Sequence, residues 1–402
     1  MIYFYDMISK KKTIIVLLTA LLCSASAQVT LQNDTIPVII HVIHANENYG
    51  SGSNLDSSQV YSQFKVLNQD FNGVGYNVQN VPAVWQSLIA VTGIKFVPAL
   101  LDPNGNLLPE PGIERIPYNS ISGLSAPGSG YSMTTVNTII KPATGWPPSL
   151  YCNIWVLKLA GGMTAYSTFP NSSGLPWLGT NPGVAVNDSL SDGIVCHFQF
   201  FGDTLNVMAP FNKGRSVTHE MGHWLGLIHF YQGCGAQYLP DLPPGDYNAC
   251  IGCPAWPCTA GVCAGFPDGP MYNNFMIYSD DACMNMFTDL QGDTMVYVLH
   301  HAQYKNNLQN SWVYHTLPTF TLENNVDVMK IYPNPGTGEF FLDSKIKNVK
   351  IKNVINSLGE KFPFEFNHLS GKLKLNSPPG IYFLVIEKEG GNLLMKLLVE
   401  NH

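Results

Sequence analysis

Charged side chains are scarce in this sequence of 402 residues: Asp, Glu, Lys and Arg together make up 12% of it, about half the share in an average domain. The 21 basic residues are outnumbered by 28 acidic residues, so the formal net charge is −7. A chain with no excess of positive charge has no basic stripe that could neutralise phosphates. Nucleic acid is therefore excluded as a main partner.

Long hydrophobic runs are missing after the N-terminus, where no stretch reaches the roughly 18 apolar residues that a membrane-spanning helix needs. At the N-terminus, three lysines at 10–12 precede the apolar run TIIVLLTALLC, and the small residues ASA follow at 25–27. This order is typical of a cleaved signal peptide. We therefore expect residues 1–27 to be removed and the mature chain to have no transmembrane segment.

Cysteine, in contrast, is well represented. One of the nine cysteines leaves with the signal peptide, and an even number in an exported chain favours disulfides. Six of the remaining eight lie between 234 and 283, where CIGCPAWPCTAGVC could alternatively hold a second zinc ion. Export and the single C-x2-C spacing favour disulfides. The eight are Cys152, Cys196, Cys234, Cys250, Cys253, Cys258, Cys263 and Cys283.

Residues 28–316 mix strand and helix patterns. An apolar stripe over 57–72 predicts a helix, with Ser57 or Ser58 as its N-cap. GGMTAYSTFP at 161–170 resembles a short edge strand beside a cleft. Further strands are expected at 36–44, 93–100 and 151–159. These elements predict an α+β domain with a twisted mixed sheet over 28–316.

The composition changes near residue 316. A linker is expected at 317–327, and from 328 to 402 short β runs alternate with turns, with many lysines and no cysteine. About 75 residues of such strands are typical of a small β-sandwich. The sequence therefore predicts two domains.

The stretch RSVTHEMGHWLGLIHF, at 215–230, contains the candidate metal ligands and the candidate catalytic base. His219 and His223 are one helical turn apart, so both imidazoles face the same side and can bind one Zn²⁺. A catalytic zinc needs a third protein ligand, and His229 is too far along while the helix continues. Gly226 can adopt a positive φ, end the helix and turn the chain back, so that His229 completes the set.

Glu220 is not expected to be a ligand. It lies next to the metal site, where its carboxylate can take a proton from the attacking water and later deliver it to the leaving amine. Trp224, Leu225 and Leu227 are expected to anchor the helix in the core. The alternative is a surface helix with incidental histidines, which the joint spacing of all five residues disfavours.

The pattern HExxHxxGxxH, followed by NNFMIYSDDACMNMFT at 273–288, resembles the metzincin signature with its methionine turn, in the form of the pappalysin-type family. PFNKGRSVTHEMGHWLGLIH and the strand YCNIWV are also similar to that family. The resemblance covers about residues 36–305. It implies a two-lobed catalytic domain with one zinc ion at the floor of a cleft.

The resemblance also implies roles for residues of the methionine turn. Met276 would form a hydrophobic floor beneath the zinc, and Tyr278 would approach the metal and help to stabilise the oxyanion. From the residues alone, Met276 would be a core residue and Tyr278 a surface aromatic. The segment after the turn lines the S1′ pocket in metzincins, so Asp281 would favour a basic P1′ side chain. Its alternatives are a solvated turn or a calcium ligand.

This chain departs from the family pattern in two places. The segment that corresponds to the acidic loop of the family reads GDYNACIGCPAW here, and Asp246 is its one remaining acidic residue. Ca²⁺ therefore remains a candidate second cofactor. Only about eight residues, QVTLQNDT, separate the signal peptide from the first strand. Asp34 is the sole acidic candidate there for blocking the zinc, and we expect that it cannot reach.

The resemblance implies two family disulfides in the cysteine-rich segment. They would be Cys234–Cys253 and a bond from Cys283 to either Cys263 or Cys258. Two further bridges would join Cys152 to Cys196, and Cys250 to the remaining cysteine.

The motifs IYPNPGTGEFFL, GIYFLVIE and KLLVEN make residues 328–402 similar to the C-terminal sorting domains of type IX secretion cargo. That resemblance implies export across the outer membrane of a Gram-negative bacterium, with the product secreted or at the cell surface. The alternative is a small adhesive or carbohydrate-binding domain, although no aromatic platform for a sugar is evident.

The sequence as a whole predicts a secreted, monomeric zinc endopeptidase that acts on proteins or peptides and is exported by the type IX machinery. The alternative is a surface binding or adhesion protein on a metzincin scaffold without relevant catalysis. Intact zinc ligands and an intact Glu220 favour the enzyme.

Overall fold

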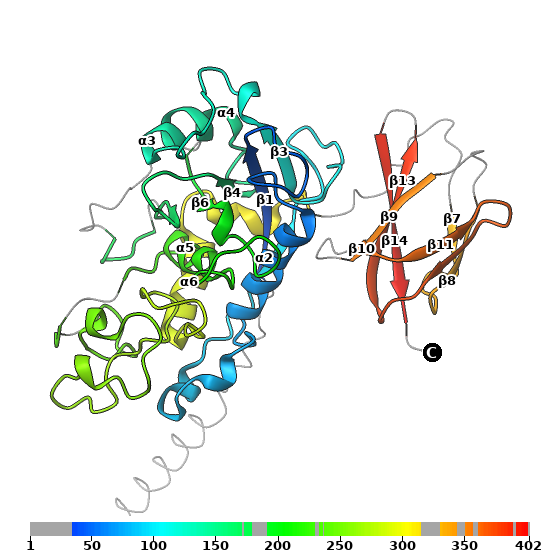
Figure 1. The fold of residues 1–402 in the computed structure, drawn as a ribbon. Coiled ribbons are helices and arrows are strands. Elements are labelled where there is room, and N and C mark those ends of the chain that lie inside the picture. The colour runs from blue at the N-terminus through cyan, green and yellow to red at the C-terminus, as the bar shows by residue number, and fades with distance from the viewer. Residues whose placement is uncertain are drawn as a thin grey trace, which may run out of the picture. The chain divides into compact units, whose positions relative to one another are not determined.

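The computed structural model describes residues 34–170, 173–178, 191–229, 233–235, 237–314, 330–343, 350–356, 361–388 and 391–400. They form an N-terminal part, 34–314, and a C-terminal part, 330–400, which are described separately (Figure 1). The signal peptide predicted at 1–27 and the linker predicted at 317–327 lie outside the described residues. Among the described helices, none has the length and apolar character needed to span a bilayer.

A six-stranded mixed sheet forms the centre of the N-terminal part, with β1 inside it. Along the main path the strands run β2-β1-β4-β6-β5, and β3 pairs with the second half of β1. All pairs are parallel except β5 with β6, so the antiparallel β5 is an edge strand. The strands are β1 Thr35–His44, β2 Lys95–Pro98, β3 Ile113–Pro117, β4 Cys152–Leu157, β5 Ala165–Ser167 and β6 Ile194–His197.

Three longer helices accompany the sheet: α2 Ser57–Asp70, α5 Arg215–Trp224 and α6 Asp289–His301. The predicted N-cap of α2 was wrong by one residue, because Asp56 has an extended backbone and its carboxylate accepts the N–H of Ser58. The shorter helical segments are η1 Val78–Asn80, η2 Ala83–Leu88, η3 Tyr118–Ser120, α3 Met133–Thr135, η4 Val136–Ile140, α4 Lys141–Thr144, η5 Phe198–Phe200, η6 Tyr247–Cys250, η7 Thr259–Gly261 and η8 Lys305–Asn310.

Both faces of the sheet are covered by apolar side chains, which is why its central strands are almost continuously apolar. On β4, Ile154 and Val156 share one cluster with α2, α5 and α6. The alternate residue Trp155 packs in a second cluster with Val136 and Ile140. Helix α5 is therefore seated on the core, with Met221 and Trp224 fully buried.

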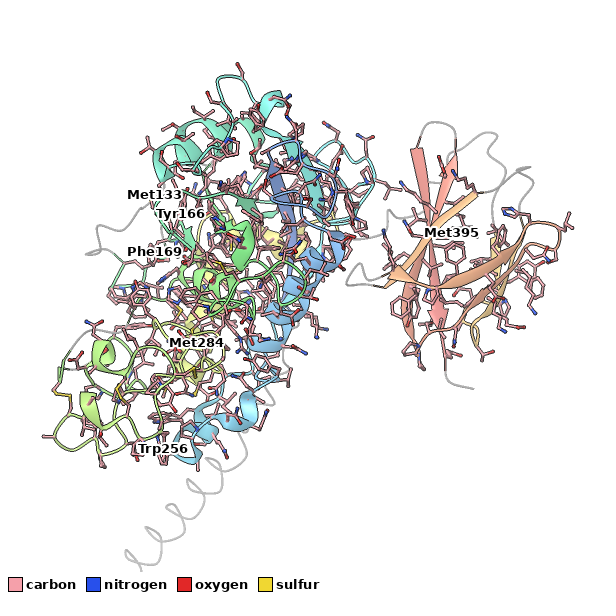
Figure 2. The ribbon with its side chains drawn as sticks, viewed as in Figure 1. Met133, Tyr166, Phe169, Trp256, Met284 and Met395 are labelled. Atoms are coloured by element: carbon pink, nitrogen blue, oxygen red, sulfur yellow. A yellow bond between two sulfur atoms is a disulfide. The ribbon has the colours of Figure 1, made fainter. Side chains whose placement is uncertain are left out.

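Three disulfides tie together the long segment between α5 and α6, which has little regular structure (Figures 1 and 2). They are Cys234–Cys263, Cys250–Cys258 and Cys253–Cys283. The predicted bond Cys234–Cys253 is therefore wrong, and Cys283 bonds to neither Cys263 nor Cys258. We call the described residues of 233–286 the disulfide loop.

Backbone pairing explains two of these connections. The N–H of Asp246 donates to the carbonyl of Gly261, and Gly245 pairs with Gly233, which brings the two ends of the Cys234–Cys263 bond together. Gly252 pairs with Ser279, which places Cys253 near the methionine turn and hence near Cys283. These contacts are long-range, so spacing alone did not reveal them.

The predicted bridge between Cys152 and Cys196 is also wrong, because both cysteines are free and buried. In the parallel pair of β4 and β6, Cys196 lies beside Val156. Cys152 comes four residues earlier on β4, roughly 13 Å along the strand. That separation is about twice the Cα–Cα distance that a disulfide spans.

The C-terminal part consists of two four-stranded antiparallel sheets, with strand orders β10-β9-β13-β14 and β11-β12-β8-β7. Both contribute to one core: Val354, Leu384 and Leu397 come from the first sheet, and Phe340 and Leu373 from the second. This is the arrangement of a β-sandwich. The strands are β7 Lys330–Tyr332, β8 Glu339–Asp343, β9 Lys350–Asn356, β10 Lys361–Phe362, β11 Phe364–Asn367, β12 Lys372–Leu375, β13 Gly380–Lys388 and β14 Gly391–Val399.

Candidate active site

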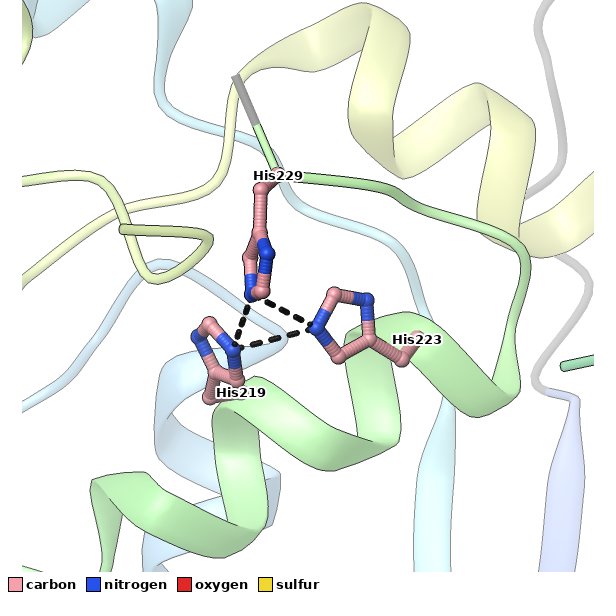
Figure 3. A group of neighbouring side chains, drawn as sticks. All are labelled: His219, His223 and His229. Atoms are coloured by element: carbon pink, nitrogen blue, oxygen red, sulfur yellow. Dashed lines mark hydrogen bonds between the residues drawn. The ribbon is translucent and has the colours of Figure 1, made fainter. Parts of the chain in front are cut away.

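The end of α5 shapes the candidate metal site. The N–H of Gly226 donates to the carbonyl of His223, and the N–H of Leu227 donates to that of Gly222. Together with the φ of +94° at Gly226, these bonds form a Schellman motif, which ends the helix and reverses the chain. His229 is thereby brought back over the face of α5 that carries His219 and His223 (Figure 3).

The Nε2 atoms of the three histidines lie 3.0 to 3.1 Å from one another (Figure 3). The Nδ1 of His219 is 2.7 Å from the carbonyl oxygen of Phe275, and the Nδ1 of His223 is 2.8 Å from that of Leu227. A carbonyl oxygen only accepts, so both Nδ1 atoms carry a hydrogen and both Nε2 atoms present lone pairs. Lone pairs that converge in this way fit a cation, and three imidazoles suit Zn²⁺.

Burial also prepares the histidines as ligands. It lowers the pKa of His219 to about 3 and that of His229 to about 4, and it holds the pKa of His223 well below its usual range. The neighbouring imidazoles further lower the pKa of His219 and His223. All three rings are therefore neutral at physiological pH, which is the form that binds a metal.

Glu220 lies beside the triad and is buried. Burial raises the pKa of its carboxyl to about 7, while a hydrogen bond from the hydroxyl of Ser167, at 2.8 Å to Oε2, acts in the opposite direction. A carboxyl that titrates near neutrality is suited to accept and return a proton. Ser167 was not predicted from the sequence, because this contact joins residues 53 positions apart.

The methionine turn lies directly beneath α5. Met276 is fully buried, and its sulfur occupies the space that a Cβ on Gly222 would need. The preceding residue, Phe275, offers the carbonyl that holds His219. The structure thus places Met276 under the helix segment that carries two of the three histidines.

Tyr278 lies at the rim of the cleft and is 64% exposed. Its hydroxyl is 3.1 Å from Nδ1 of His229, the ring nitrogen that faces away from the triad. The phenol therefore contacts the third histidine from outside. Burial of one side of the ring raises the pKa of its hydroxyl, so the hydroxyl keeps its proton at neutral pH.

Asp281 is fully buried, so the alternative of a solvated turn is wrong. Its Oδ2 accepts the backbone N–H groups of Lys213 at 2.7 Å and Arg215 at 3.2 Å, at the start of α5. Its Oδ1 has no hydrogen-bond partner within the described part of the chain, and the residue lines the cleft. Burial raises the pKa of this carboxyl to about 6.

These residues surround one cavity of about 660 Å³. Its lining includes the three histidines and Glu220, with Tyr166 and Phe169 from the β5 side and Met284 from the disulfide loop (Figure 2). Within the described ranges, no second group of three His, Cys, Asp or Glu side chains could hold a metal ion.

Comparison with known proteins gives the same picture. A peptidase M43 family model, described as pregnancy-associated plasma protein-A, matches residues 135–300, and a secretion system C-terminal sorting domain matches 330–400. The chain is 32% identical to mature mirolysin of Tannerella forsythia, solved with a cleaved peptide; the match covers 68% of this chain and 95% of that one, with a TM-score of 0.55. For promirolysin of the same organism the identity is 31%, over 69% and 84% of the two chains, with a TM-score of 0.55.

Among curated proteins, extracellular metalloprotease 1 of Coccidioides posadasii is 36% identical over 146 residues, which are 36% of this chain and 47% of that protein. A second fungal extracellular metalloprotease, from Verticillium alfalfae, is 34% identical over 148 residues, or 48% of its length. The chain thus spans about half the length of these two relatives.

Proposed function

Because this chain belongs to the pappalysin-type metzincin family of metalloproteases and carries a C-terminal secretion sorting domain, we propose that it is a secreted zinc endopeptidase. The observation that carries the proposal is the convergence of three Nε2 atoms beside a buried Glu220, within one cleft. The peptide bound to mature mirolysin supports a peptide as the occupant of such a cleft.

His219, His223 and His229 would hold the zinc ion. When bound, the ion would act as a Lewis acid that lowers the pKa of water and polarises the substrate carbonyl. Glu220 takes the proton of the attacking water on its carboxylate and passes it to the leaving amine. The Tyr278 hydroxyl, protonated at the cleft rim, donates a hydrogen bond to the substrate oxygen as negative charge develops there.

Substrate choice is proposed to depend on Asp281. Its Oδ1 lies buried at the cleft without a partner among the described residues, and a buried carboxylate oxygen is stabilised by a cationic donor. A Lys or Arg side chain at P1′ would supply that donor. The enzyme would therefore cleave before basic residues.

The sorting domain and the extracellular relatives support a secreted or cell-surface protein. The type IX machinery of a Gram-negative bacterium is the exporting partner that this domain implies.

A peptide-library digestion tests the whole proposal. The mature protein is incubated with the library, every cut is mapped by mass spectrometry, and Glu220→Ala protein and chelated protein serve as controls. We expect cuts before Arg or Lys that are absent from both controls. Cuts without a P1′ preference would remove Asp281 from its role. An absence of cuts by folded, zinc-loaded protein would favour a binding protein on the same scaffold.

A further inference from the structure

We propose that Ser167 is a positioning residue, which orients the Glu220 carboxylate so that Oε1 is the oxygen that accepts the proton. This inference rests on the peptidase function proposed above and adds a residue on the edge strand β5. The contact that carries it is the hydrogen bond from Ser167 Oγ to Glu220 Oε2, at 2.8 Å. Both side chains are buried, each with 8% of its surface exposed.

A carboxylate at the end of a flexible side chain has no intrinsic orientation. The last torsion of Glu is broad and roughly two-fold, so its two oxygens exchange places easily. Within the described part of the chain, the Ser167 hydroxyl is the sole hydrogen-bond partner of the Glu220 carboxylate. This single donor makes the two oxygens different, because it engages Oε2 and leaves Oε1 for the reacting water.

The strand that carries Ser167 is itself held firmly. Ser167 pairs with Ile194 of β6, and the next residue, Thr168, exchanges two further hydrogen bonds with Gly193. The Thr168 hydroxyl also lies 3.1 Å from Oδ1 of Asp192, to which it donates. Because β5 cannot shift easily, the donor at Ser167 has a fixed position.

The same network reaches α5. Oδ2 of Asp192 accepts the indole N–H of Trp224, the last residue of the helix, at 3.1 Å. Strand β5 and helix α5 are thus joined twice, at Ser167–Glu220 and through Asp192. The second link fixes the two backbones, and the first then acts on the orientation of the carboxylate.

The proposed role of position 167 requires a small side chain that donates a hydrogen bond. Alanine would leave Oε2 of a buried carboxylate without its partner, and an acidic residue would place a second negative charge against it. Threonine keeps the hydroxyl and suits a strand. We therefore expect activity to follow the hydroxyl and not the size of the side chain.

The test compares full-length, zinc-loaded variants. For Ser167→Ala we expect kcat to fall about tenfold with KM nearly unchanged, the lower end of the range for the loss of an outer-shell partner at a metal site. Ser167→Thr should recover most of kcat. Thr144→Val is the matched control, since it removes another buried hydroxyl, one that bonds to Trp155 and not to Glu220 and lies outside the network that holds β5. It should lower the melting temperature without a comparable loss of kcat.

A second readout does not depend on activity. In crystals of the metal-free Ser167→Ala protein, the Glu220 carboxylate should occupy more than one orientation, whereas the parent protein should show one. Wild-type kcat in Ser167→Ala, or an equal loss in Thr144→Val, would overturn the inference. A change in KM alone would overturn it as well. If the parent protein cleaves no peptide, the proposed function fails, and the crystals still decide the positioning role.

Discussion

The two sides of the cleft are held in place by different means. On one side lie β5, β6 and α5, which we call the helix–sheet side; it contains buried side chains that are joined by hydrogen bonds, such as Ser167 to Glu220 and Trp224 to Asp192. On the other side lies the disulfide loop, which has little regular structure and contains all three disulfides. Both sides contribute residues to the same cavity.

The helix–sheet side depends on two buried ion pairs. Lys305 Nζ lies 3.1 Å from Oδ1 of Asp192, and Arg215 Nη2 lies 3.1 Å from Oδ1 of Asp70, with both cations almost fully buried. Arg215 also donates from Nη1 to the carbonyls of Asp281 and Met284, at 2.7 Å each, and so ties the start of α5 to the segment after the methionine turn. None of the ion pairs found between described residues lies within the disulfide loop itself.

The difference shows that the two sides of one site can be destabilised by different changes. A buried ion pair is strongly sensitive to the loss of one partner, because the other charge remains buried. A disulfide acts largely by restricting the unfolded chain, and it is lost on reduction without any substitution. The helix–sheet side should therefore respond most to single mutations, and the disulfide loop most to reducing agents.

The largest effect should come from removing the chemistry while the structure stays intact. Glu220→Gln keeps the shape of the side chain but removes the base, so peptide cleavage should fall by a factor of about 10² to 10⁴. Zinc content and melting temperature, measured on the same preparation, should match the parent protein. A variant that lost zinc as well would show that Glu220 also supports the metal site.

The next effect concerns the buried ion pairs. Lys305→Met leaves Asp192 buried without its cation, so the free energy of unfolding should fall by about 3 to 5 kcal/mol. A shift in the thermal unfolding curve would measure it. Lys350→Ala is the control, because its pair with Glu387 is exposed and its loss should leave the unfolding curve almost unchanged. Equal shifts would contradict the view that burial makes the helix–sheet side sensitive.

The disulfide loop can be tested by removing its bridges one at a time. Loop-closure entropy predicts a loss of roughly 3 to 4 kcal/mol for the double serine variant at Cys253 and Cys283, which are 30 residues apart. Cys250 and Cys258 are 8 residues apart, and their removal should cost about 1 kcal/mol less. Unfolding curves with and without reductant provide the measurement. A parent protein insensitive to reductant would contradict the comparison.

The smallest effect is a change of selectivity with pH. Burial raises the pKa of Asp281 to about 6, despite the Arg215 guanidinium, which lowers it; the nearby Asp70 carboxylate raises it further. The carboxylate is therefore charged above about pH 6, and the preference for Arg at P1′ should fall about tenfold as the pH drops from 7.5 to 5.

The measurement is the ratio of kcat/KM for two peptides that differ only in Arg or Gln at P1′. Taking the ratio cancels the titration of Glu220, which acts on both peptides. In Asp281→Asn the ratio should be small and independent of pH. A ratio that still rises with pH in this variant would assign the preference to another residue.

Much of the helix–sheet side could be predicted because its signals are local. The spacing of His219 and His223 defines one face of a helix, and Gly226 follows at the position where a Schellman motif needs a positive φ. The almost continuous run of apolar and β-branched residues likewise identified the strand at 36–44, which the structure places at Thr35–His44. The position of the N-cap of α2 was missed by one residue, since Asp56 and the serines after it are all good caps.

Contacts between segments that are far apart in the sequence could not be predicted from it. Disulfide connectivity depends on which loop segments lie side by side, and the spacing of the cysteines leaves many pairings open. The bond from Ser167 to Glu220 and the ion pair of Lys305 with Asp192 likewise join residues far apart in the sequence, 53 and 113 positions respectively. Nothing in the local pattern around Ser167 distinguishes it from other serines in loops and strands.

The contact between Gly222 and the sulfur of Met276 has a consequence for the mutational tolerance of the motif. Inside the five residues 219–223, two are histidines of the triad, Glu220 carries the proposed base, and Met221 is fully buried. Gly222 has no chemical role, yet any larger residue would meet Met276 and Phe287. A library randomised at 219–223 and selected only for folding and metal binding should therefore still return glycine at 222, and freedom should reappear there only when Met276 is replaced by a smaller residue.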